Sequence, residues 1–168
     1  MTSSNARFDL PALYRALDER RRNRGMSWQE AAREVGGQAR GRDHRLSAST
    51  LKRTARGGQM EADGVLAMVR WLGLAFEDFT LNAKPTPAVT VHKHGLRRFS
   101  SQAFYEALDG RRQSQNHTWK DIAAQLDGFS PGMLKRLAKR GRMTVEQVVR
   151  LSSWLEAAPE EFTRGASR

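Results

Sequence analysis

The chain contains one sequence unit twice, and this internal duplication restricts the possible folds more than any other feature. At a shift of about 91 positions, residues 12–18 align with 103–109, and a paired arginine, a tryptophan and a glycine follow at matching positions. Farther along, at a shift of about 83, residues 51–53 align with 134–136. About a third of the aligned positions are identical. Self-similarity over a whole unit predicts two copies of one small domain.

The change of shift places about eight extra residues, 38–45 (QARGRDHR), inside the first copy. Between the copies, residues 81–98 contain two prolines and a glycine, a composition typical of a linker. The sequence therefore predicts a first domain over 8–80, a linker over 81–98 and a second domain over 99–163.

Each copy has the pattern of short helices throughout. In the first copy, apolar residues at helical spacing predict a helix from about Leu10 to Gly25. A capping box, Ser27-Trp28-Gln29-Glu30, begins a second helix that we expect to run through Val35 and to stop at Gly36-Gly37. Ser47 caps a third helix, which runs to about Arg56.

A fourth helix is predicted over 62–72 by the spacing of Ala62, Val65, Leu66, Val69 and Leu72, and a short fifth helix follows around 77–79. The second copy repeats this order, with Pro131 at the first position of its third helix. The predicted fold class is all-α, with five short helices in each copy.

The net charge of the 168-residue chain is +11, which predicts a polyanionic partner: nucleic acid first, an anionic membrane surface second. No apolar run approaches the roughly 18 residues of a membrane span, and the basic helices direct their apolar residues to the core, so we expect no membrane partner. The chain has no cysteine, which excludes disulfides and thiolate metal sites. With no secretory signal at its start, the expected location is cytoplasmic and nucleoid-associated.

The second and third helices of each copy carry the functional pattern. In the second copy, Ile122, Ala123 and Leu126 precede a short turn, and Leu134 and Leu137 follow it. A small residue lets two short helices cross closely, and the spaced leucines anchor the later helix while its other face stays exposed. This order resembles the helix-turn-helix of the lambda repressor and Cro superfamily, the Xre-like regulators. The resemblance covers both copies and implies two tandem five-helix domains of that fold, joined by the linker.

The chain departs from the family pattern at the turn. The second copy has Asp127-Gly128 there, and the first copy has the basic insert 38–45. The resemblance implies that the third helix of each domain enters the major groove and that its outward residues meet base edges. The residues that map to base reading are Ser47, Ser49, Lys52 and Arg53 in the first domain, and Ser130, Lys135 and Arg136 in the second.

Other residues around these helices are expected to bind backbone phosphates. Residues 38–59 contain about six Lys or Arg and one acid, and residues 129–142 contain about five and none, whereas the fourth and fifth helices are acidic. A solvated loop is the alternative for the insert. The predicted phosphate ligands are Ser27, Gln29, Arg40, Arg42, Arg45, Arg56, Thr118, Lys120, Lys139, Arg140 and Arg142.

No arrangement of residues predicts catalysis, a metal or a cofactor. His92 and His94 have no carboxylate nearby, and nothing marks a Ser-His-Asp arrangement. The four tryptophans repeat in pairs beside the apolar stripes of their helices, which favours core packing over stacking on single-stranded bases. We therefore do not expect an enzyme.

The predicted function is that of a sequence-specific double-stranded DNA-binding transcriptional regulator, a repressor. One chain would act as a covalent pseudo-dimer on an asymmetric site. In the alternative interpretation one domain binds DNA and the other is a protein-interaction or dimerisation module, which would imply a homodimer or a protein partner. Structure-selective or RNA binding is a third interpretation. Inverted and direct arrangements of the two half-sites are both open at this point.

Overall fold

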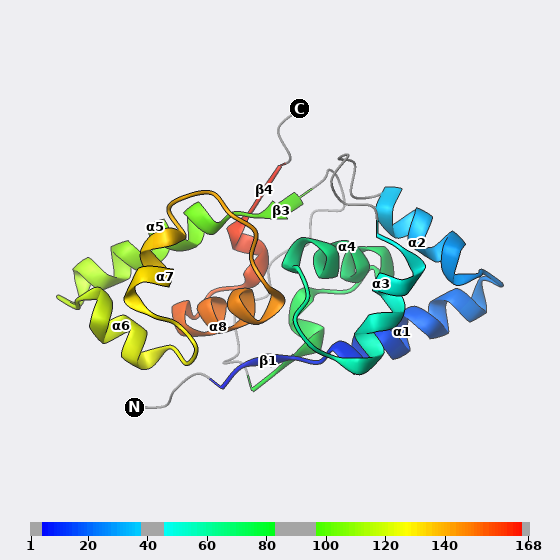
Figure 1. Cartoon of the computed structure of the whole chain (residues 1–168), viewed down its shortest axis with the longest axis horizontal. Helices are drawn as coiled ribbons and strands as arrows, with labels where there is room; N and C mark the ends of the chain where they lie inside the picture. The colour runs from blue at the N-terminus through cyan, green and yellow to red at the C-terminus, as the bar shows by residue number, and fades with distance from the viewer. Residues whose placement is uncertain (1–4, 38–45, 83–96, 166–168) are drawn as a thin grey trace.

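The computed structural model describes residues 5–37, 46–82 and 97–165 (Figure 1). These residues are mostly helical, with only two-stranded sheets of two or three residues per strand, which confirms the predicted all-α class. The first repeat consists of β1 (Arg7–Phe8), α1 (Leu10–Asn23), α2 (Trp28–Gly37), α3 (Ala48–Arg53), η1 (Thr54–Arg56), α4 (Ala62–Leu72), η2 (Phe76–Phe79) and β2 (Thr80–Leu81).

The second repeat has the same order of helices and is closed in the same way. Its elements are β3 (Arg97–Phe99), α5 (Ser101–Ser114), α6 (Trp119–Gln125), α7 (Pro131–Arg136), α8 (Val145–Leu155), η3 (Pro159–Phe162) and β4 (Thr163–Gly165). In each repeat the first strand pairs antiparallel with the last, so Phe8 lies opposite Thr80 and Phe99 lies opposite Thr163.

Two details differ from the sequence prediction. The second helix continues through Gly36 and Gly37, because neither glycine adopts the left-handed conformation that would end it. The predicted linker also begins and ends in strands, with Leu81 in β2 and Arg97 and Arg98 in β3. Strands of two or three residues are too short for a detectable period-two pattern, so the sequence did not reveal them.

The helix ends follow from local side-chain chemistry. Asp9 caps α1 by accepting a hydrogen bond from the Ala12 N–H at 2.8 Å. At the other end of the unit, Gly73 terminates α4 in the left-handed conformation with φ of 72°. The aligned residue of the second repeat is Glu156, which adopts φ of 57° without being a glycine.

Helices α4 and α8 form the centre of the molecule and pack against each other. The apolar face predicted for α4 is buried, but so are Gly64, Ala67, Met68 and Trp71 on its other sides. A helix buried on most of its sides needs cover beyond one face, and here the second repeat supplies part of that cover. The buried side chains of both repeats accordingly belong to one continuous core.

Reciprocal hydrogen bonds join the repeats. Met60 and Met143 occupy aligned positions, as do the residues two places later, Ala62 and Val145. The Ala62 N–H donates to the Met143 carbonyl at 2.9 Å, and the Val145 N–H donates to the Met60 carbonyl at 2.9 Å. Contacts in which residue i meets j and the equivalent j meets i define a two-fold relation.

A second reciprocal pair supports the same symmetry. The Phe99 N–H donates to Asp63 Oδ1 at 2.9 Å, and the Phe8 N–H donates to Glu146 Oε1 at a longer 3.5 Å. Phe8 aligns with Phe99, and Asp63 aligns with Glu146. The two repeats are therefore related by a pseudo-two-fold axis, which passes close to the antiparallel bridge between Glu61 and Thr144.

The contact between Phe76 and Glu160 at the interface lacks a symmetric partner. The Phe76 N–H donates to Glu160 Oε1 at 2.8 Å, but the residue aligned with Phe76 is Pro159, which has no N–H to return the bond. Burial raises the pKa of the Glu160 carboxyl, and the nearby charges of Glu77 and Asp78 act in the same direction. The symmetry is thus approximate, and it is broken by particular substitutions.

Candidate nucleic-acid interface

Helix α3 is held by very few buried groups, and its other residues are exposed or half-buried. Leu51 is fully buried, and Thr54 directly after the helix is buried with its hydroxyl donating to the Leu51 carbonyl at 2.6 Å. Ala31, Ala32 and Val35 of α2 are buried in the same core. Of the predicted base-reading residues of this repeat, all are exposed: Ser47, Ser49, Lys52 and Arg53.

A small cluster of hydroxyls begins α3. Ser47 Oγ accepts a hydrogen bond from the Thr50 N–H at 3.1 Å, which caps the helix as predicted. The same oxygen lies 2.7 Å from Ser49 Oγ and 2.9 Å from Thr50 Oγ1. Three side chains that can both donate and accept hydrogen bonds therefore lie together at the exposed start of this helix.

Helix α7 has the same frame with a different surface. Ser130 caps it by accepting from the Met133 N–H at 3.2 Å, Pro131 is its first residue, and Leu134 is fully buried. Ser130, Lys135 and Arg136 are exposed, as the base-reading prediction requires. The positions aligned with Ser49 and Thr50 are Gly132 and Met133, so the hydroxyl cluster of α3 has no counterpart here.

The starts of α2 and α6 are less suited to phosphate than the sequence suggested. The Ser27 N–H and hydroxyl both donate to Glu30 Oε2 at 2.7 Å, and the Thr118 N–H and hydroxyl donate to Asp121 Oδ2 at 2.7 Å. These bonds lower the pKa of both carboxyls, chiefly through the Ser27 N–H for Glu30 and the Thr118 hydroxyl for Asp121. Each helix start therefore holds an ionised carboxylate, which repels a phosphate. The side chains of Gln29 and Lys120 remain exposed beside them.

The remaining predicted phosphate ligands fall into two groups. Arg56, Lys139, Arg140 and Arg142 are exposed in the segments that follow α3 and α7. Arg140 Nε donates to Gln102 Oε1 at 3.3 Å, and an Arg142 terminal nitrogen donates to Glu61 Oε1 of the other repeat at 2.9 Å. Arg40, Arg42 and Arg45 of the basic insert lie outside the described residues.

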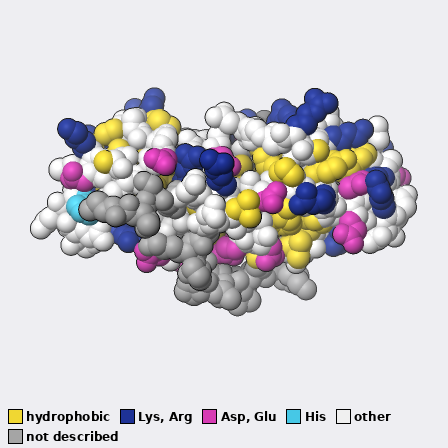
Figure 2. All heavy atoms as spheres, turned by 90° about the horizontal axis from the view of Figure 1, so that it is seen from below, with side chains coloured by type: hydrophobic (Ala, Val, Ile, Leu, Met, Phe, Trp, Pro, Cys, Tyr) yellow, Lys and Arg dark blue, Asp and Glu magenta, His cyan; other side chains and the backbone are white. Residues whose placement is uncertain are grey.

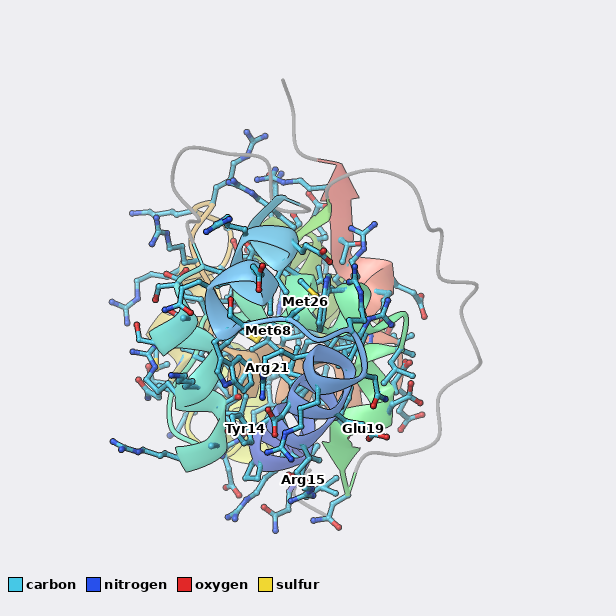
Figure 3. All side chains as sticks on the ribbon, turned by 90° about the vertical axis from the view of Figure 1, so that its right-hand side faces the viewer. Tyr14, Arg15, Glu19, Arg21, Met26 and Met68 are labelled. Carbon is cyan, nitrogen blue, oxygen red and sulfur yellow. The ribbon has the colours of Figure 1, made fainter. Side chains whose placement is uncertain are left out.

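Helices α3 and α7 lie on the same side of the molecule. Both face the viewer in Figure 1, on opposite sides of the packed pair α4 and α8. Figure 2 shows that side as its upper edge, where Lys and Arg side chains gather, while most of the acidic side chains lie lower on the face in view. In Figure 3 the same side is the left edge, where α3 is drawn. The basic helices α3 and α7, which the pseudo-two-fold axis relates, are thus exposed on one side of the molecule.

Several arginines near the ends of α1 and α5 make contacts within the protein and are not free to bind an anionic partner. Arg21 pairs with Asp18 at 2.6 Å, donates to the Met26 carbonyl at 2.8 Å and lies 4.9 Å from the ring centroid of Trp28. Figure 3 shows Arg21 and Tyr14 on the ribbon of α1, and Tyr14 stacks on Trp28 at 5.4 Å. The excess of positive charge is therefore only partly available to a partner.

The tryptophans pack within each repeat, as the sequence indicated. Trp119 repeats the arrangement of Trp28, stacked on Tyr105 at 5.3 Å with Arg112 at 5.3 Å from its ring. Trp71 is buried and donates to Glu34, and Trp154 donates to Gln125. Their ring faces contact neighbouring side chains and do not form a platform for unpaired bases.

The residues that unite the two repeats were not found by sequence reasoning. The alignment shows Phe8 and Phe99 as equivalent residues, and Asp63 and Glu146 as equivalent residues, but it does not indicate that Phe8 bonds to Glu146 and Phe99 to Asp63. Likewise, nothing in the sequence marks the Met60 and Met143 carbonyls as hydrogen-bond acceptors.

Within the described ranges, no group of three His, Cys, Asp or Glu side chains could hold a metal ion. His44, His92 and His94 lie outside those ranges. In the same part of the chain, every helix is too short or too polar to cross a lipid bilayer. The chain matches no family model, no curated protein and no solved structure.

Proposed function

We propose that this protein binds double-stranded DNA sequence-specifically as a covalent pseudo-dimer of two Xre-like helix-turn-helix units and acts as a transcriptional regulator. The observation that carries the proposal is the presentation of α3 and α7, two exposed basic helices, on one side of a pseudo-two-fold axis. B-DNA presents its major groove twice on one face, about 34 Å apart, and an α-helix fits that groove.

The reciprocal bonds at the repeat interface favour an inverted arrangement of half-sites. Two-fold-related readers meet DNA half-sites of opposite orientation, whereas a direct repeat would need units related by translation. The backbone bonds between residues 60–62 and 143–145 also hold the two readers at one separation. We therefore expect an approximately inverted repeat of fixed spacing.

The two half-sites should nevertheless differ in sequence. Lys52 and Arg53 align with the basic residues Lys135 and Arg136, but Ser49 aligns with Gly132, which has no side chain. Because α4 and α8 already cover each other within one chain, a single chain would occupy the whole site.

Selection from randomised duplexes tests the proposal. The expected result is one enriched motif with two related but unequal halves, bound by one chain per duplex. Binding should weaken steeply with salt, as expected for about six to ten phosphate contacts. Binding that does not change between low and physiological salt, or a selection without any motif, would refute the proposal.

Paired substitutions separate the proposal from the single-reader alternative. Alanine at Lys52 and Arg53, and separately at Lys135 and Arg136, removes matched cations from α3 and α7. Two readers predict a large loss of affinity from either pair. If only one pair matters, the other repeat is an interaction module. Arg15→Ala is the control, because Arg15 is exposed on α1 and lies at the lower edge of Figure 3, away from the side of α3.

A further inference from the structure

Two loops meet beside the pseudo-two-fold axis and carry different charges. We call residues 57–61 the first axis loop and residues 140–144 the second axis loop. Each supplies the methionine carbonyl that accepts a hydrogen bond from the opposite repeat. The second axis loop has Arg140 and Arg142 where the first has Gly57 and Gln59. Arg56 and Lys139, the residues before the loops, are both basic.

The second axis loop is held in place by bonds on both sides. The Gly141 N–H donates to Ser101 Oγ of α5 at 3.1 Å, and Arg140 Nε donates to Gln102 on the same helix. Arg142 crosses to Glu61 of the first repeat, and its side chain is still 63% exposed. Lys139 and Arg140 are exposed as well. An ordered loop therefore presents a run of cations next to α7.

Between helices α3 and α7, it is the first repeat that has more polar side chains. The hydroxyls of Ser49 and Thr50 both lie within 3 Å of Ser47 Oγ at the start of α3. At the positions of α7 that align with Ser49 and Thr50, Gly132 has no side chain and Met133 has only a thioether. Among the residues that the structure describes, the first repeat thus has more groups that can recognise bases, and the second has more charges that can hold phosphates.

We propose that the two repeats divide the binding between them: the second anchors the DNA backbone regardless of sequence, and the first supplies most of the base discrimination. This inference rests on the proposed function. Phosphate contacts position a protein without reading sequence, whereas hydrogen bonds to base edges discriminate. One half of the site should accordingly tolerate base changes far better than the other.

The salt dependence of binding tests the anchoring role. The double variant K139Q/R140Q removes two cations from the second repeat, and Arg15→Gln is the control for net charge. On both the selected and a scrambled duplex, K139Q/R140Q should lower the slope of log K against log salt by about 2, since each phosphate contact contributes roughly 0.9. The ratio of the two affinities should not change. The graft Gln59→Arg, which copies Arg142, should strengthen binding to both duplexes alike.

Exchanging residues between the reading helices tests the discriminating role. The variant S49G/T50M gives α3 the residues of α7 at these two positions and should lower the preference for the selected over the scrambled duplex by about tenfold, within the range for a base contact. The reciprocal variant G132S/M133T should sharpen the second half-site in a repeat selection. Because G132S/M133T changes α7 alone, it still tests the discriminating role if S49G/T50M destabilises α3.

The outcomes distinguish the inference from the function beneath it. Two half-sites of equal information content, or a salt slope unchanged in K139Q/R140Q, would overturn the division of roles while leaving sequence-specific binding intact. Absence of both a motif and salt-dependent binding would overturn the proposed function, and the inference with it.

Discussion

The hydrogen bonds across the pseudo-two-fold axis can be removed with little change to either helix that makes them. Ala62 is the first residue of α4, a position where proline is well tolerated because its N–H is not used within the helix. The preceding Glu61 already has φ of −68° and ψ of 132°, which suits a residue before proline. Ala62→Pro therefore deletes the bond to the Met143 carbonyl and should leave α4 itself intact.

The expected cost follows from that single bond. Leaving the Met143 carbonyl without its donor should cost about 1–3 kcal/mol. Restriction of the unfolded chain by proline offsets about 0.4–1 kcal/mol of this. The net loss of unfolding free energy is then centred on about 1.3 kcal/mol and is at most about 2.6 kcal/mol, and the central value corresponds to a fall in Tm of about 3–5 °C for a chain of this size.

Urea unfolding followed by the fluorescence of the four tryptophans measures this loss. Ala62→Val is the control for added volume, because it carries the residue of the aligned position 145 and keeps the N–H. Ala48→Pro is the control for proline itself, since it copies Pro131 onto the first residue of α3 and should leave stability unchanged or raise it by up to about 1 kcal/mol. If A62P were as stable as both controls, the bond would not hold the repeats together.

Three further predictions concern stability. The raised pKa of Glu160 means that the folded state binds the proton of this carboxyl more tightly than the unfolded state does, so the stability that this group contributes is full at low pH and is lost as pH rises through the folded-state pKa. Glu160→Gln should therefore be more stable than the parent protein in denaturant at pH 7 but not at pH 4. The control Glu19→Gln, on the exposed face of α1, should not show this difference between the two pH values. Glu156→Gly, which copies Gly73, should raise the unfolding free energy by about 0.5–1 kcal/mol by relieving a left-handed backbone, and an unchanged urea midpoint would argue against that strain. Leu51→Ala should cost about 2–5 kcal/mol because this leucine is the buried anchor of α3, whereas Ser49→Ala on the exposed side should cost far less, and equal losses in thermal unfolding would contradict this packing.

The sequence was most informative about local structure. Capping residues such as Ser47, Thr118 and Ser130 were identified because a cap needs only neighbours within three residues. The exposure of Lys52, Arg53, Lys135 and Arg136 also followed from helical spacing around one buried leucine. The capping box at Ser27 is visible in the sequence, but the structure shows that its Glu30 carboxylate occupies the start of α2, where its charge opposes a phosphate.

The duplication alone established that the chain has two like frames with unlike surfaces. It left open how those frames are oriented, because aligned sequences are compatible with both inverted and direct arrangements. The tertiary structure decided this through bonds between backbone groups, at Met60, Ala62, Met143 and Val145, whose donors and acceptors are the same for every residue type except proline. Side-chain patterns report which face of a helix is buried, but only the folded chain shows which backbone groups meet across an interface.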